Sequence, residues 1–292
     1  MELFLQQFFS GIALGGIYSI LALALVMIFK ASRDINFALG EMAMFSTYIA
    51  WWMITNGVPY WWAFIFTVIV SFFFGLFLER WIYRPFEKAS HLVHLMVFIG
   101  LLLIINGLAG WIFGYELQEF PSPFSETIFP KNPYIGAHEM GVICVSICVM
   151  ILLSIFFRCT NVGLCMRGTA ENQESSRLVG IRVGWMLALA WGIAASIGAI
   201  AGMLSAPTLF LDPNMMGGVL LYSLAGAILG GITSPAGAVL GGLCMGVTEN
   251  LAGTYLPFIG NELKLPFALF IILLVMAVRP EGIFGKTLVR RV

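Results

Sequence analysis

Long runs of apolar residues, separated by short polar segments, dominate the chain. A membrane-spanning helix needs about 20 predominantly apolar residues, with a range of about 17–25. The runs are continuously apolar, whereas strands of a transmembrane barrel alternate between apolar and polar residues. The pattern therefore predicts spanning helices over residues 8–29, 36–56, 60–78, 92–115, 139–157, 185–205 and 264–279.

A further apolar stretch, residues 217–250, is too long for one spanning helix. Thr233-Ser234-Pro235 interrupts it, and a proline lacks a backbone donor and clashes with the preceding helical turn. We expect two shorter helices, 218–232 and 236–250. Irregular backbone at membrane depth survives only where protein or a water-filled cavity covers it, so this broken-helix pair is expected to line a pore.

Glycines recur at four-residue spacing in several of these segments. Such spacing lets two helix backbones approach closely in lipid, and tight helix packing is the simplest interpretation. The pairs are Gly11/Gly15, Gly198/Gly202, Gly226/Gly230, Gly237/Gly241 and Gly242/Gly246.

Composition supports the membrane interpretation. Of 292 residues, 60% are hydrophobic and 10% are charged, against about 25% charged in a soluble domain. The sequence predicts an all-α membrane protein, a polytopic transmembrane helical bundle of about eight or nine membrane segments including the half-helices, with residues 1–292 forming a single domain. Lys plus Arg and Asp plus Glu are equal at 15 each, so no basic excess suggests a nucleic-acid partner.

The basic residues predict the orientation, because cytoplasmic loops of membrane proteins are enriched in Lys and Arg. Of the 15 Lys and Arg residues, all but Lys131 and Lys264 fall on one side of the predicted spans. That side is assigned to the cytoplasm, which places the amino terminus outside and the carboxy terminus inside. No basic segment precedes the first apolar run, so we expect that run to be retained as a membrane helix.

Few polar side chains lie within the spans, and those few are informative. A charge at the bilayer centre costs about 2.5–3.5 kcal/mol on insertion scales and usually faces a cavity or a partner. Glu41 lies near the start of the second span, Asn106 in the fourth, and Glu249 with Asn250 at the end of the second half-helix. One interpretation is a translocation path lined by Asn36, Glu41 and Glu249; the other is interhelical hydrogen bonding that fixes the bundle.

Histidines and cysteines give no metal-binding pattern. His91 and His94 are three residues apart at the start of the fourth span, but no third ligand is evident in the sequence, so we expect an interfacial location and no metal site. The five cysteines form no CxxC pair and are expected to pack as small apolar residues.

The segment 158–184 is the most informative loop. It lies on the predicted cytoplasmic side and carries four Arg residues together with Glu171 and Glu174. Residues 169–179 are expected to form one short helix, capped by Thr169 and ended by Gly180. Mixed charge favours docking of this helix on a protein partner over a lipid surface.

The tail contains a segment that imitates a phosphate-binding loop. Gly285-Lys286-Thr287 has the final residues of such a loop, but Pro280 stands where the first glycine is required. That loop also needs a preceding strand and a following helix. We therefore expect no nucleotide site in this chain.

Five motifs stand in a fixed order along nearly the whole chain. They are Ile35-Asn36-Phe37-Ala38 with Gly40-Glu41, Glu79-Arg80 with Tyr83-Arg84-Pro85, Arg167 to Ile181, which includes Gly168, Ala170, Glu171, Asn172 and Gly180, Leu229-Gly230-Gly231-Ile232 with Gly237–Gly242, and Pro280–Gly285. Together they resemble motifs of the LivH-like permease subunits of ABC importers for branched-chain amino acids. The first resembles an INFA-x-GE signature, and the third resembles the segment that couples to the ATPase.

The resemblance implies a permease without catalytic activity in the inner membrane of a bacterium. It implies a translocation path that includes Asn36, Gly40, Glu41, Glu249 and Asn250, and ATPase coupling through Arg167, Gly168, Ala170, Glu171, Asn172 and Gly180. The implied partners are a homologous second permease, two ATPase subunits that bind ATP and Mg²⁺, and a soluble substrate-binding protein. No cofactor is implied for this chain itself.

Other transport classes stay open at this point. An ion-gradient-driven secondary transporter would use Glu41 as its ion site and would need no docking segment at 158–184. Permeases of the same superfamily also carry urea and short amides. A channel would need a ring of selectivity groups, and the sequence offers none.

Overall fold

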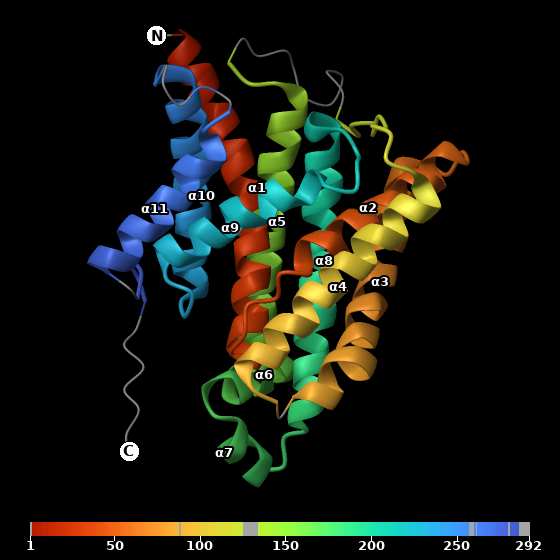
Figure 1. The fold of residues 1–292 in the computed structure, drawn as a ribbon, viewed down its shortest axis with the longest axis vertical. Coiled ribbons are helices and arrows are strands. Elements are labelled where there is room, and N and C mark those ends of the chain that lie inside the picture. The colour runs from red at the N-terminus through yellow and green to blue at the C-terminus, as the bar shows by residue number, and fades with distance from the viewer. Residues whose placement is uncertain are drawn as a thin grey trace. The chain divides into compact units, whose positions relative to one another are not determined.

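The computed structural model describes residues 2–87, 89–124, 134–256, 260, 262–279 and 281–285. Within these ranges the chain forms helices and turns and no strand; one isolated bridge pairs Gln118 with Leu211. The long helices match the predicted spans to within a few residues at most ends (Figure 1). They are α1 (Glu2–Ser32), α2 (Leu39–Thr55), α3 (Tyr60–Phe77), α4 (His91–Phe113), α5 (Ala137–Cys159), α8 (Val183–Leu209), α9 (Met215–Gly230), α10 (Pro235–Tyr255) and α11 (Lys264–Val278).

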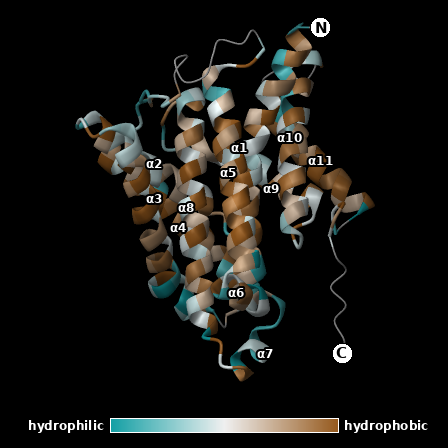
Figure 2. Ribbon diagram, turned by 180° about the vertical axis from the view of Figure 1, so that it is seen from behind, coloured by the Kyte–Doolittle hydropathy of each residue, from teal (hydrophilic) through white to brown (hydrophobic). Residues whose placement is uncertain are grey.

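Several helices are long and apolar enough to cross a bilayer, which confirms a polytopic helical membrane protein. They are α1, α3 with its continuation to Phe86, α4, α5 and α8, while α9 and α11 are shorter apolar helices. Most of α1 and α8 is buried by other parts of the chain, whereas α3, α4 and α5 leave most of their apolar surface uncovered. Figure 2 shows hydrophobic residues, coloured brown, along these helices. Uncovered apolar helix faces are what lipid requires.

The chain divides into two compact units, each assembled from segments distant in sequence. The first contains residues 1–26, 124–146 and 218–292, and the second contains residues 27–123 and 147–217. Three helices, α1, α5 and α9, each contribute residues to both units. The units are described separately below.

In the first unit, α10 packs closely against α1 and α9 through glycine. A Cβ atom on Gly242 would lie 2.7 Å from Ser19 Cα of α1, and one on Gly226 would lie 2.7 Å from Gly242 Cα. A Cβ atom on Gly246 would overlap the backbone nitrogen of Gly15. The four-residue glycine spacing therefore marks real backbone contacts in this unit, as expected.

The predicted break between the two shorter helices is confirmed at residues 231–234. Gly231 has φ +105° at the end of α9, and the Ser234 side chain accepts a hydrogen bond from Gly237 N (3.1 Å) to begin α10, with Pro235 as its first residue. The last carbonyls of α9 are also satisfied, since Leu229 O and Gly230 O accept from the backbone nitrogens of Ile283 and Phe284. The segment 281–285 thus completes the end of α9.

In the second unit, α8 packs against α2 and α3. The α3 helix continues as a π-helical turn, η1 (Leu78–Tyr83), and a 3₁₀ turn, η2 (Arg84–Phe86). Trp191 of α8, Tyr83 and Phe98 form a buried aromatic group with ring centroids 5.2–5.9 Å apart. Two short helices, α6 (Asn161–Glu171) and α7 (Gln173–Leu178), connect α5 to α8.

Gly246→Ala is expected to destabilise the protein, because the added Cβ atom meets the backbone of α1 and neither backbone can yield cheaply. Overpacking of this kind costs about 1–3 kcal/mol of unfolding free energy. Gly107→Ala is the matched control, since a Cβ atom at this position on α4 meets nothing within 4 Å. Removing a helical glycine there should be neutral or stabilising by about 0.5–1 kcal/mol. Thermal unfolding in detergent measures both, and equal stability of the two variants would contradict the glycine contact.

Candidate functional site

The local structure before α2 places Glu41 in the second unit. Asn36 Oδ1 accepts from Ala38 N (2.9 Å), and this turn lets α2 begin at Leu39. Glu41 therefore lies in the first turn of α2, where the exposed backbone N–H groups favour negative charge. Its side chain is 7% exposed, and Gly40 beside it is buried.

Asn106 of α4 connects Glu41 to the segment between α8 and α9. Its Nδ2 atom lies 3.2 Å from Glu41 Oε2, 2.8 Å from Pro213 O and 3.3 Å from Asn214 Oδ1. A carboxamide has two N–H donors, so these three acceptors compete for two hydrogens. Asn214 is exposed, and the cluster thus reaches from a buried carboxylate to the surface of the unit.

Hydrogen bonds from Leu211 and Asn214 hold in place the segment that carries Pro213 and Asn214. Gln118 and Leu211 exchange two hydrogen bonds of 2.9 Å, and Asp212 Oδ2 accepts from Asn214 N (3.2 Å). Sequence reasoning noted Asn106 but did not include it in the site, and it missed Asp212 and Asn214. The signal for the latter is an Asp-Pro-Asn segment between two apolar helices.

Asn36 is completely buried in this conformation. Its Oδ1 atom is used by the turn before α2, and its Nδ2 atom has no hydrogen-bond partner among the described residues. It therefore has a clear local role as a turn residue, while its predicted place in a translocation path stays a prediction.

Glu249 and Asn250 belong to the first unit, where both connect α10 to α1. The Tyr18 hydroxyl donates to Glu249 Oε2 (2.8 Å), and the Tyr222 ring stacks on Tyr18 at 5.3 Å. Asn250 Nδ2 donates to the backbone and side-chain oxygens of Gln7, at 2.7 and 2.9 Å. These contacts are the interhelical hydrogen bonds of the second interpretation, and the place of the same groups in a translocation path stays a prediction.

The loop 158–184 contains two helices where one was expected over 169–179. Thr160 caps α6 by accepting from Gly163 N (2.9 Å), and Asn172 caps α7 by accepting from Ser175 N (2.9 Å). Thr169 is not a cap, because it is buried inside α6 and its hydroxyl donates to Cys165 O. Glu171 is the last residue of α6, whereas Gly180 has the expected left-handed backbone, with φ +85°.

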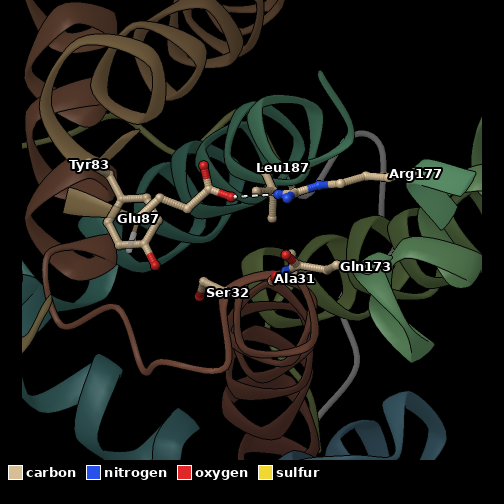
Figure 3. A pocket seen from close by; sticks show the side chains of 7 residues that line it. All are labelled: Ala31, Ser32, Tyr83, Glu87, Gln173, Arg177 and Leu187. Carbon is tan, nitrogen blue, oxygen red and sulfur yellow. Dashed lines mark hydrogen bonds and ion pairs between the residues drawn. The ribbon is translucent and has the colours of Figure 1, made fainter. Parts of the chain in front are cut away.

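Three contacts anchor α6 and α7 to other parts of the second unit. Arg33 Nη2 donates to Ala170 O (3.2 Å), Gln173 Nε2 donates to Ala31 O (2.8 Å), and Arg177 pairs with Glu87 (3.3 Å). The second and third of these contacts line a cavity of about 220 Å³, and Figure 3 shows Arg177 paired with Glu87 there. Its lining residues are Ala31, Ser32, Tyr83, Glu87, Gln173, Arg177 and Leu187.

The outer surface of the loop carries residues predicted for coupling together with two apolar residues. Arg167, Glu171, Asn172 and Gly180 are exposed, while Gly168 and Ala170 are half-buried. Leu178 and Val179, at the end of α7, are 89% and 76% exposed. Exposed apolar side chains that lie together mark surfaces for contact with protein or membrane.

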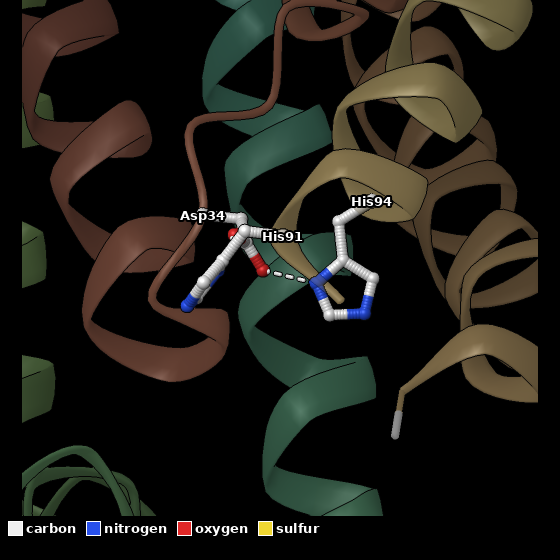
Figure 4. A group of neighbouring side chains, drawn as sticks. All are labelled: Asp34, His91 and His94. Carbon is white, nitrogen blue, oxygen red and sulfur yellow. Dashed lines mark hydrogen bonds and ion pairs between the residues drawn. The ribbon is translucent and has the colours of Figure 1, made fainter. Parts of the chain in front are cut away.

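One group of side chains in the described structure could hold a metal ion. Asp34, before α2, lies beside His91 and His94 of α4 (Figure 4). The third candidate ligand, Asp34, lies more than fifty positions before His91, which is why the local pattern of the two histidines does not reveal it.

These features define a helical membrane protein of the transport class, with polar clusters between its helices and an anchored loop at one end. The model of the family described as "Branched-chain amino acid transport system / permease component" matches residues 7–276, and the chain belongs to this family. It is a permease component and a multi-pass membrane protein.

Individual relatives agree over almost the whole chain. The permease protein LivH of the high-affinity branched-chain amino acid transport system of Salmonella typhimurium is 30% identical, over 99% of this chain and 98% of the relative. BraD of the corresponding Pseudomonas aeruginosa system is 29% identical with the same coverage. The solved structure of PsaBC from Streptococcus pneumoniae in complex with Fab shares the fold, with a TM-score of 0.51, 13% identity and coverage of 93% of this chain and 91% of that one.

Asn106→Leu is expected to lower the unfolding free energy by about 1–3 kcal/mol, because it leaves the buried Glu41 carboxylate without its donor. Replacing both partners, as in Glu41→Leu with Asn106→Leu, should cost less than the two single changes added together. Thermal or denaturant unfolding of the four proteins in detergent completes the cycle. Additivity within about 0.5 kcal/mol would show that the two side chains are not coupled.

Proposed function

We propose that this chain is the membrane-spanning permease subunit of an ABC importer for branched-chain or related amino acids. The single observation that carries the proposal is the family match over residues 7–276, including the loop 158–184. The partners in this proposal are a homologous second permease, two ATPase subunits that hold ATP and Mg²⁺, and a soluble substrate-binding protein. The location is a bacterial inner membrane.

The anchored loop supports delivery of energy from separate subunits. The chain has no complete phosphate-binding motif, so the energy of ATP hydrolysis enters through a contact surface. In this contact surface, exposed Leu178 and Val179 supply apolar contacts for the ATPase subunits, and Arg167 and Glu171 supply charges. The contacts of Ala170 and Gln173 with Arg33 and Ala31 connect a movement of the loop to the end of α1.

The Glu41 cluster supports a path for a small zwitterion. Asn106 and Asn214 present amide groups that can bind a carboxylate or an ammonium group in turn, and both lie beside the buried Glu41 carboxylate or its amide partner. The cluster has few charges, so the proposal assigns most of the substrate selectivity to the binding protein. In a secondary transporter Glu41 would instead bind the driving ion, and transport would continue without ATP.

The proposed orientation places the amino terminus outside and α6 and α7 in the cytoplasm. It rests on the basic residues, of which Lys88, Lys131, Lys286, Arg290 and Arg291 lie outside the described residues.

Labelling from outside intact cells tests this orientation. In a variant without native cysteines, Leu117→Cys should react with an impermeant maleimide and Glu171→Cys should not, because both side chains are exposed but belong to opposite ends of the spans. After the cells are permeabilised, both positions should react. Labelling of position 171 in intact cells would reverse the orientation.

Leu178→Ser with Val179→Ser tests the coupling surface. Both side chains are exposed, so the protein should fold and insert normally, but the ATPase subunits should no longer copurify in mild detergent. Substrate-stimulated ATP hydrolysis in reconstituted vesicles should fall at least tenfold. Leu117→Ser, which removes a 69% exposed leucine at the other end of the spans, is the matched control and should keep both properties.

The same preparations test the proposed function as a whole. The parent protein should copurify with two ATPases and a second permease, and its uptake of leucine, isoleucine or valine should require ATP hydrolysis. Uptake by this chain alone, driven by an ion gradient, would overturn the ABC importer assignment.

A further inference from the structure

Three side chains with metal-binding chemistry meet at the segment that joins α1 to α2. His91 Nδ1 lies 2.7 Å from Asp34 Oδ1, and His94 Nδ1 lies 2.6 Å from Asp34 Oδ2. One candidate ligand atom from each of the three residues lies within 4.8 Å of the other two. Figure 4 shows both imidazole rings beside the carboxylate.

The contact of the second ring nitrogen of His94 determines which nitrogen of the neutral ring carries the hydrogen. His94 Nε2 lies 2.7 Å from Phe86 O, and a carbonyl oxygen only accepts, so Nε2 carries a hydrogen. In the neutral ring Nδ1 is then a bare acceptor that faces a carboxylate oxygen. Two acceptors at this distance need a cation between them, either a proton or a metal ion. A backbone carbonyl on the second nitrogen is also the usual support of a metal-binding histidine.

The surrounding residues hold Asp34 in position. Arg33 has a left-handed backbone with φ +66°, and Ser32 Oγ contacts both Asp34 N and Asp34 O. The Tyr83 hydroxyl lies 3.4 Å from Asp34 Oδ2, and its ring packs on that of His94 at 5.2 Å. The side chains of Asp34 and His94 are 10% and 6% exposed, whereas that of His91 is 81% exposed.

We propose that Asp34, His91 and His94 form a binding site for a divalent transition-metal ion of the Zn²⁺ class. Zn²⁺ binds imidazole nitrogen and carboxylate oxygen at about 2.0–2.2 Å, so ligand atoms in a tetrahedral site lie roughly 3.4 Å apart. The nitrogen and oxygen atoms here need to separate by less than about 1 Å to reach that geometry, and the exposed His91 ring can move. The exposed side of the site leaves the fourth coordination position to a water molecule.

A metal ion at this site links the segment before α2 to the first turn of α4. Arg33, next to Asp34, donates to Ala170 in α6, so the site is one residue from a contact of the coupling loop. Bound metal therefore restrains the same segment to which that loop is anchored. Metal binding itself does not depend on the proposed transport function.

Zn²⁺ binding to the full-length protein tests the proposal. The protein is purified in detergent with a tag other than polyhistidine, stripped with chelator, and titrated with ZnCl₂ against a chromophoric chelator. One ion should bind per chain, and His91→Gln and Asp34→Asn should each weaken binding at least tenfold. His91→Gln is the primary variant, because an 81% exposed side chain can be replaced without disturbing the fold.

His138→Gln is the matched control, since the chain has three histidines and His138 is not part of the cluster. It should bind Zn²⁺ as the parent does. A second measurement is the shift of the thermal unfolding midpoint by Zn²⁺, which should appear in the parent and in His138→Gln but not in His91→Gln. Unchanged affinity in His91→Gln and Asp34→Asn, or no stoichiometric binding by the parent, would overturn the proposal.

Discussion

Hydrocarbon offers no hydrogen bonds, so a polar group inside a membrane span has to find its partner within the protein. This constraint accounts for the polar contacts that join helices. Glu41 is bound by Asn106, Glu249 by Tyr18, and Asn250 by the two oxygens of Gln7. Each contact joins two helices, so the few polar residues of an apolar chain also determine which helices are neighbours.

The same constraint applies to the backbone where a helix stops. The α9 helix ends inside an apolar region, and its last carbonyls accept hydrogen bonds from Gly231 and from Ile283 and Phe284. Glycine makes this possible, because a Cβ atom on Gly282 would lie 2.5 Å from the Gly231 backbone. A broken helix in this protein is therefore stabilised by a segment about fifty residues further along the chain.

The helical spans were predictable from sequence because each is specified locally, by apolar length and, at several ends, by a nearby proline or glycine. The break at Ser234-Pro235 was predictable for the same reason. The helices of the loop 158–184 were not, because Thr160 and Thr169 are equally good caps in isolation and only burial of Thr169 distinguishes them. The partners of Glu41 and of His94 lie about sixty or more residues away, and no local pattern specifies such contacts.

The helices α6 and α7 not only connect α5 to α8 but are also held to other parts of the second unit by specific contacts. The side chains of Arg33, Gln173 and Arg177 all bridge between this loop and other parts of the same unit, and two of the three use backbone carbonyl groups that every sequence provides. A displacement of α7 by a partner therefore has to strain or break contacts to the end of α1 and to Glu87. Because Arg33 precedes Asp34 and the turn at Asn36, such a displacement acts on the segment that begins α2, the helix that carries Glu41. The structure thus contains a continuous covalent and hydrogen-bonded route between the exposed loop and the buried carboxylate, and a transport cycle driven from outside the chain requires a route of this kind.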